Sequence, residues 1–189
     1  MTSPLVVGIS GASGALYGVR MLEVLRRIRI PAHLIVSKAA GLTLKEETGT
    51  SIDEVREIAA VSYSNSDVGA AISSGSFKTR GMVVIPCSIR TLSDIAYGTT
   101  SSLISRAADV ALKERRRLVL VVRETPLHAG HLRSMLAATE NGAIIMPPVP
   151  ALYHKPKTVA EIVDQTIGRC LDLFDIDTGD LVKRWQSNT

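Results

Sequence analysis

Short apolar runs recur along the chain and alternate with segments of helical periodicity. The runs are Leu5–Ile9, His33–Ser37, Met82–Pro86, Leu118–Val122 and Ala143–Pro147. Each is rich in β-branched residues and continuous rather than alternating, which is typical of strands buried on both faces. The pattern therefore predicts about five parallel strands covered by helices.

The segments between these runs carry helix signals. Ser51 is followed three residues later by Glu54, which is the spacing of a capping box at a helix start. Near the C-terminus, one helical stripe of apolar residues comprises Val159, Ile162, Val163, Ile167, Cys170, Leu171 and Phe174. Strands and helices in alternation predict the α/β class. We expect a three-layer, flavodoxin- or Rossmann-like, doubly wound parallel sheet, forming a single domain over residues 1–189.

The composition agrees with a helix-covered sheet and indicates in which cellular compartment the protein works. Apolar residues make up 46% of the chain and aromatic residues only 4%, so the core consists mostly of Val, Ile, Leu and Ala. The two cysteines, Cys87 and Cys170, lie far apart and form no CxxC pair, which favours a reducing cytoplasm. No apolar run approaches the roughly 20 residues of a membrane-spanning helix. The sequence predicts a cytoplasmic protein without a membrane segment.

The net charge of +4 is compatible with binding nucleic acid or a small phosphorylated substrate. The densest cluster, Arg115-Arg116-Arg117, stands where a helix is expected to end, and cations are favourable there. The chain has no interleaved aromatic and basic residues of the kind that bind single-stranded nucleic acid. We therefore expect no nucleic-acid partner.

Small, hydroxylated or charged residues follow every predicted strand. Open parallel sheets bind ligands at the carboxyl ends of their strands, so these segments are candidate site walls. The first, Ser10-Gly11-Ala12-Ser13-Gly14, matches neither GxGxxG nor the Walker pattern. The others are Ser37-Lys38, Cys87-Ser88-Ile89-Arg90-Thr91, Arg123-Glu124-Thr125-Pro126 and Pro147–Tyr153. Hydroxyls and backbone amides without a dominant positive charge suit a phosphomonoester such as FMN.

Other candidate sites have competing interpretations. Arg106, Asp109 and Lys113 share one helix face, which is either a second anion site or a solvated, salt-bridged surface. His128 and His131 stand three apart, but no third ligand completes a metal site, and we predict none. Cys87 is either a nucleophile at a helix start or a packed thiol. The GxSxG motif of serine hydrolases is absent.

Over nearly its full length the chain resembles the UbiX family of flavin prenyltransferases. The resemblance rests on GISGASGALYGVR, SKAA, ISSGSF, PCSxxTLS, RAADVALKERR, RETPLHxxHL, MPPxPAxYH and the terminal RW, in this order and spacing. It implies a flavodoxin-like homododecamer. The implied reaction moves a dimethylallyl group from its monophosphate to N5 and C6 of reduced FMN, without a metal. Prenylated FMN then serves a separate UbiD-type decarboxylase, such as that of the ubiquinone pathway.

The resemblance also assigns roles to individual residues. It places the proton-transfer pair Ser13 and Glu47 near flavin N5 and the leaving phosphate, and Glu124 near the second new bond. Cationic groups such as Lys113 and Arg169 are expected to stabilise the charge that develops on the leaving phosphate. The implied FMN site comprises Gly11, Ala12, Ser13, Ser37, Ser88, Ile89, Arg90, Thr91 and Arg123. The implied prenyl-phosphate site comprises Tyr153, Arg169, Lys113 and Arg106, with Trp185 closing over it.

Two other functions compete with this interpretation. An FMN-dependent decarboxylase of the cysteine-decarboxylase superfamily shares the fold and the FMN loop, but it needs a catalytic His and an Asn-containing motif that we do not find. A flavodoxin-like electron carrier would not need Lys113, Arg169 and Tyr153. The sequence leaves open which decarboxylase pathway is served and whether the donor is the monophosphate or the pyrophosphate.

Overall fold

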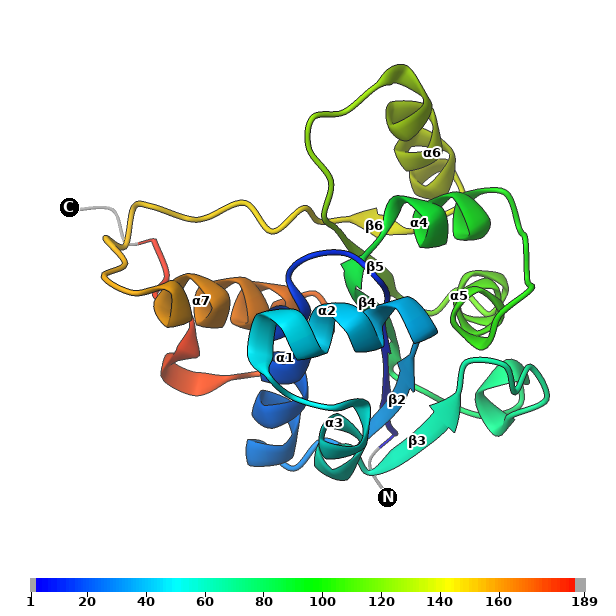
Figure 1. The fold of residues 1–189 in the computed structure, drawn as a ribbon, viewed down its shortest axis with the longest axis horizontal. Coiled ribbons are helices and arrows are strands. Elements are labelled where there is room, and N and C mark those ends of the chain that lie inside the picture. The colour runs from blue at the N-terminus through cyan, green and yellow to red at the C-terminus, as the bar shows by residue number, and fades with distance from the viewer. Residues whose placement is uncertain (1–2, 186–189) are drawn as a thin grey trace.

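The computed structural model describes residues 3–185, which form a six-stranded sheet in the order β3-β2-β1-β4-β5-β6 (Figure 1). Every neighbouring pair of strands is parallel. The strands are β1 (Leu5–Ile9), β2 (Ala32–Val36), β3 (Val61–Ser64), β4 (Gly81–Cys87), β5 (Leu118–Val122) and β6 (Ile144–Ile145). The predicted parallel α/β sheet is confirmed.

One strand was absent from the sequence prediction, and one is shorter than predicted. β3 reads Val-Ser-Tyr-Ser and is only half-buried or exposed, because it lies at the edge of the sheet. An edge strand needs no continuous apolar run, so the apolar pattern does not indicate it. At the other edge, β6 retains only Ile144 and Ile145 of the predicted Ala143–Pro147. Pro147 and Pro148, which follow Met146, have no N–H to donate to a ladder.

Most of the helices begin after a residue whose side chain caps the first turn. Ser51 accepts a hydrogen bond from the backbone N–H of Glu54, and the Glu54 carboxylate accepts one from the N–H of Ser51, so the predicted capping box is confirmed. The helices are α1 (Ala15–Arg27), α2 (Lys38–Thr48), α3 (Ile52–Ile58), α4 (Ile89–Ala96), α5 (Leu103–Lys113), α6 (Ala129–Glu140) and α7 (Val159–Asp172).

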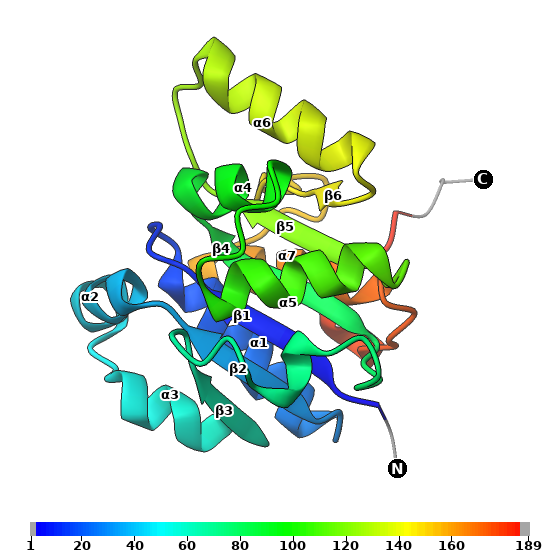
Figure 2. The same cartoon turned by 90° about the vertical axis from the view of Figure 1, so that its right-hand side faces the viewer.

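Two apolar cores lie on the two faces of the sheet. On one face, α1 and α7 pack beside each other, burying residues such as Leu22 and Ile167. The other face carries α4 and α5 (Figure 2). These helices bury residues such as Leu92 and Ala108. Most of the predicted α7 stripe is buried, but Val159 at its start is 67% exposed. Helices on both faces confirm the three-layer arrangement.

The direction of winding reverses at β1. Its neighbours are β2 on one side and β4 on the other, so the helices that follow β1 and β4 leave toward opposite faces. The loops after these two strands therefore diverge and leave a crevice at the carboxyl edge of the sheet. The fold places the candidate site at this crevice.

Candidate active site

A cleft of about 670 Å³ opens at this carboxyl edge. Ligand pockets for small molecules and cofactors commonly have volumes of this order, ~300–1,000 Å³. The loops after β1, β2 and β4 and the first turns of α2 and α4 contribute Gly11, Ser37, Lys38, Ala39, Ser88, Arg90 and Thr91 to its wall. Other positions contribute Leu42, Asn65, Asp94, Ser101, Ser102 and Ile104. The structure thus brings the predicted FMN residues Gly11, Ser37, Ser88, Arg90 and Thr91 into one cleft.

Two helix N-termini face this cleft. Ser37 caps α2 by accepting a hydrogen bond from the N–H of Ala40 at 3.1 Å. Ser88 caps α4 by accepting one from the N–H of Thr91 at 3.3 Å, and its hydroxyl also donates to the Thr91 hydroxyl at 3.1 Å. The helix dipole and the free N–H groups of a first turn favour an anion. The geometry suits a phosphate held by amides and hydroxyls.

Ser10 joins the two loops on either side of the crevice, and the sequence analysis did not assign it a role. Its side chain is buried, with 1% of the residue exposed. The hydroxyl donates to the carbonyl of Pro86 at 2.9 Å and accepts from the N–H of Ser88 at 2.8 Å. Its position directly after β1 was the only sequence signal. Ser10 fixes the first loop against the start of α4.

The first loop approaches α2 closely at Gly11. A β-carbon at this position would lie 2.4 Å from Cβ of Ala39, which is far inside van der Waals contact. Gly14 has φ 99°, a left-handed conformation that favours glycine. Both glycines are therefore required by the path of the loop. Ala12 and Ser13 lie between them and do not line the cleft itself.

Glu47 reaches from α2 to the start of α1. Its carboxylate accepts hydrogen bonds from the N–H groups of Gly14 and Ala15, each at 2.8 Å. No side chain of the loop caps α1, so Glu47 supplies the cap from another helix. The structure therefore places Glu47 against the residues that follow Ser13, and gives it a structural contact that the resemblance did not predict.

The loop after β5 carries Arg123 and Glu124 beside the end of β4. The N–H of Arg123 donates to the carbonyl of Cys87 at 3.1 Å, and both Arg123 and Glu124 are exposed. Cys87 itself is fully buried, and burial raises the pKa of its thiol far above the ordinary range. A buried, protonated thiol supports the packing interpretation of Cys87 rather than the nucleophilic one.

Lys113 and Arg106 do not reach the cleft within one chain. Lys113 is the last residue of α5 and forms an ion pair with Glu114. Because β5 begins only five residues later, Lys113 lies at the amino edge of the sheet, opposite the cleft. Arg106 pairs with Asp109 at 2.8 Å. Within this chain the shared helix face is salt-bridged.

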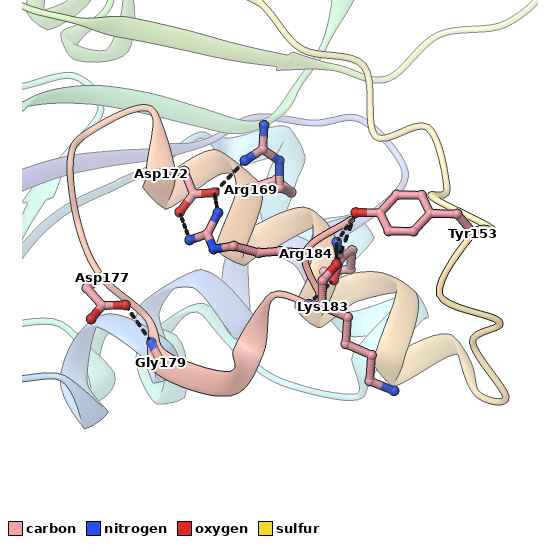
Figure 3. A network of polar contacts seen from close by, with 8 residues as sticks. Tyr153, Arg169, Asp172, Asp177, Gly179, Lys183 and Arg184 are labelled. Carbon is pink, nitrogen blue, oxygen red and sulfur yellow. Dashed lines mark hydrogen bonds and ion pairs between the residues drawn. The ribbon is translucent and has the colours of Figure 1, made fainter. Parts of the chain in front are cut away.

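Tyr153 and Arg169 lie beside α7 and the C-terminal segment (Figure 3). Neither they nor Trp185 line the cleft. The rings of Tyr153 and Trp185 meet edge to face, with centroids 5.5 Å apart. Asp172 accepts from Arg184 at 2.9 Å and from Arg169 at 2.5 Å. The hydrogen bond from Arg184 is the main reason that the pKa of Asp172 is lowered, and Arg169 adds to it.

The position of Arg115–Arg117 relative to helix α5 differs from the prediction. Helix α5 ends at Lys113, so Arg115–Arg117 follow the helix instead of closing it, and Arg115 has φ 54°. Arg116 donates to the backbone carbonyls of Gly75 and Phe77. The three arginines, together with Arg80, line a second cavity of about 490 Å³ at the amino edge of the sheet. The carbonyl contacts give Arg116 a structural role in holding the segment that precedes β4.

Histidines do not assemble a metal site in the part of the chain that the structure describes. His128 caps α6 by accepting from the N–H of Gly130 at 3.0 Å, and its ring stacks on His131 with centroids 3.6 Å apart. Across residues 3–185, His, Cys, Asp and Glu form no group of three or more suited to a metal. Over the same residues, no helix has the length and apolar character needed to cross a bilayer.

Comparisons with known proteins place the chain in a family. The flavoprotein family model matches residues 2–172. Flavin prenyltransferase UbiX of Escherichia coli K12 is 58% identical over 184 residues, covering 96% of this chain and 97% of that protein. The crystal structure of AnUbiX (PadA1) with FMN and dimethylallyl pyrophosphate has a TM-score of 0.97 at 49% identity, covering 99% of each chain.

Further solved structures separate the close relatives from those that share only the fold. A dodecameric FMN-dependent UbiX-like decarboxylase from Escherichia coli O157:H7 has a TM-score of 0.94 at 46% identity, covering 97% of this chain and 100% of that one. The cysteine decarboxylase TvaF is only 14% identical, with a TM-score of 0.64 over 88% of this chain and 99% of that one, and so shares the fold alone. The chain belongs to the flavoprotein family and, within it, to the UbiX flavin prenyltransferases.

Proposed function

We propose that this enzyme transfers a dimethylallyl group from its phosphate ester to N5 and C6 of reduced FMN and so makes prenylated FMN. The observation that carries the proposal is the cleft at the carboxyl edge, which the capped N-termini of α2 and α4 line together with Gly11. This arrangement suits a flavin mononucleotide, whose phosphate needs amide and hydroxyl donors.

The residues of the cleft fit FMN in chemistry and size. Ser37, Ser88 and Thr91 supply hydroxyls, Arg90 supplies a cation, and Gly11 allows close approach of the backbone. Ala12 and Ser13 lie on the Gly11 loop, Ile89 begins α4, and Arg123 follows β5 beside Cys87. These four residues extend the site that we propose. When bound, reduced FMN supplies the two nucleophilic ring atoms.

Side chains of the protein accept the proton and bind the leaving phosphate. We assign the proton from flavin N5 to Ser13 and Glu47, whose loop and carboxylate are in contact through Gly14. We place Glu124 at the second new bond between the dimethylallyl group and the flavin. Tyr153, Arg169 and Lys113 hold the phosphate, with Arg106 beside them and Trp185 covering them. Several cations around one phosphate stabilise the charge that develops on it without a metal.

These cations require more than one copy of the chain. Lys113 lies at the sheet edge opposite the cleft, so a neighbouring copy must present it. The dodecameric UbiX-like relative supports such an assembly for this protein. A subunit-mixing experiment tests this: Lys113→Ala and Ser13→Ala proteins, each inactive alone, should regain activity when dissociated and reassembled together. Absence of any recovery in mixed oligomers would contradict the contribution of Lys113 by a neighbouring copy.

The product is expected to leave for a UbiD-type decarboxylase, as the resemblance implies, with ubiquinone synthesis as one pathway. We place the reaction in the cytoplasm. The two cysteines support this location because both are free and buried, and a reducing compartment keeps thiols in that state.

The mass of bound flavin tests the proposal directly. After anaerobic incubation with reduced FMN and dimethylallyl monophosphate, we expect a flavin heavier by one isoprenyl unit. A parallel incubation with the pyrophosphate compares the two donors, since the AnUbiX structure contains the pyrophosphate. Unmodified FMN with both donors would contradict the proposal and favour the FMN-dependent decarboxylase.

A further inference from the structure

The buried carboxamide of Gln165 in α7 joins Tyr153 to the C-terminal segment. Only 3% of Gln165 is exposed. Its Nε2 donates to the Tyr153 hydroxyl at 3.0 Å and to the carbonyl of Lys183 at 3.2 Å, and its Oε1 accepts from the N–H of Lys183 at 2.9 Å. Figure 3 shows the Tyr153 hydroxyl beside Lys183, with α7 running next to them.

Only one orientation of this carboxamide satisfies its neighbours. If the oxygen and nitrogen were exchanged, the oxygen would face the Lys183 carbonyl and the NH₂ group would face the Lys183 N–H. Both contacts would pair like with like. Gln165 therefore donates to Tyr153, and both of its amide hydrogens are used.

The two bonds of the Tyr153 hydroxyl have different consequences. The oxygen accepts from Gln165, which fixes where the oxygen lies. The hydroxyl proton is donated to the Lys183 carbonyl at 3.1 Å. Rotation about the C–O bond turns this proton toward another acceptor without moving the oxygen. A phosphate oxygen that approaches Tyr153 can then receive the proton, while the Lys183 carbonyl keeps its bond from Gln165.

We propose that Gln165 is a positioning residue for substrate binding, which holds the Tyr153 hydroxyl as a donor to the phosphate of the prenyl substrate. The hydrogen bond that Tyr153 accepts also strengthens the one it donates. The proposal rests on the proposed function, because it takes the prenyl phosphate as the ligand of Tyr153.

Two substitutions of Gln165 separate its effects. Gln165→Leu removes all three hydrogen bonds at similar volume. Gln165→Glu keeps an acceptor for the Lys183 N–H but offers only oxygens to Tyr153, so the Tyr153 proton turns toward the carboxylate. Thr166→Val, at a buried neighbour whose hydroxyl donates to the Ile162 carbonyl, is the matched control.

Steady-state kinetics in two backgrounds test the positioning role. We expect either Gln165 variant to raise KM for dimethylallyl monophosphate roughly five- to twentyfold, with FMN affinity within about twofold of the wild type. In a Tyr153→Phe background, Gln165→Leu should add less than about twofold. An unchanged KM, or an equal effect of Gln165→Leu in both backgrounds, would overturn the proposal.

A second measurement distinguishes this inference from the proposed function. Trp185 is the only tryptophan of the chain and packs against Tyr153, so its emission reports their contact without any turnover. Gln165→Leu should shift the emission and increase acrylamide quenching, whereas Thr166→Val should not. Unchanged Trp185 fluorescence would refute the positioning role. A wild type that makes no prenylated flavin would refute the proposed function. The fluorescence comparison would still test whether Gln165 positions Tyr153, because it needs no turnover.

Discussion

The carboxylate of Glu47 in α2 accepts a hydrogen bond from the N–H of Gly14 at 2.8 Å, and so caps the helix that begins at the next residue. Two residues that are 33 positions apart in the sequence thereby meet at the loop that carries Ser13. The same carboxylate is thus both a helix cap and the group that we assign to proton transfer. The first prediction separates these roles.

Glu47→Gln keeps an oxygen for the α1 cap but removes the proton acceptor. We expect the variant to retain FMN, to lose most prenylation and to lose less than about 1 kcal/mol of folding free energy. Bound-flavin mass and urea unfolding measure these effects. Glu46→Gln, an exposed neighbour, is the control. Turnover equal to the wild type would contradict the proton-transfer role.

Ser10→Ala removes the bridge between the two loops of the crevice. The buried carbonyl of Pro86 and N–H of Ser88 lose a partner, so we expect a loss of about 1–3 kcal/mol in unfolding free energy and weaker FMN binding. Denaturant unfolding and flavin titration measure both. Ser64→Ala, on an exposed strand end, should leave both unchanged. A Ser10 variant as stable as the wild type would show that the bridge contributes nothing.

Gly11→Ala introduces a methyl group 2.4 Å from Cβ of Ala39. The loop must move away from α2, and we expect a cost of about 1–3 kcal/mol and at least tenfold weaker FMN binding, because the residue also lines the cleft. Gly69→Ala is a suitable comparison, since its added carbon would have an ordinary 3.6 Å contact. Tight flavin binding by the Gly11 variant would remove this loop from the site.

The ion pairs of Asp172 predict a pH-dependent contribution to stability. Arg184 and Arg169 lower the pKa of Asp172 below its ordinary 3.8, so the folded state favours the carboxylate. The contribution is present above about pH 3.8 and is lost as pH falls through the folded-state pKa. We expect Asp172→Asn to cost about 1 kcal/mol at pH 7 and less at pH 2.5.

Urea unfolding of both proteins at the two pH values measures this difference. Asp67→Asn, at an exposed carboxylate, controls for the change in net charge. A stability difference between Asp172→Asn and the wild type that stays constant from pH 7 to pH 2.5 would show that Asp172 does not titrate with folding.

Local patterns in the sequence determined the class of the fold and the composition of the strand-end loops. Continuous apolar runs predict buried parallel strands, because strands covered on both faces have no polar side. The runs at β1 and β5 match the structure residue for residue. The hydroxyls Ser37 and Ser88 stand at predicted strand ends, and parallel strands carry such ends to one edge, so their meeting in one cleft was predictable.

Only the tertiary structure decided which distant residues meet. The contacts of Glu47 with Gly14, of Ser10 with Ser88 and of Gln165 with Lys183 join segments that no local pattern relates. The tertiary structure also placed Lys113 at the opposite sheet edge and gave the polar edge strand β3 its partner. Such contacts depend on helix packing and strand order. Sequence periodicity limits these to a class of folds, but it does not specify which individual residues meet.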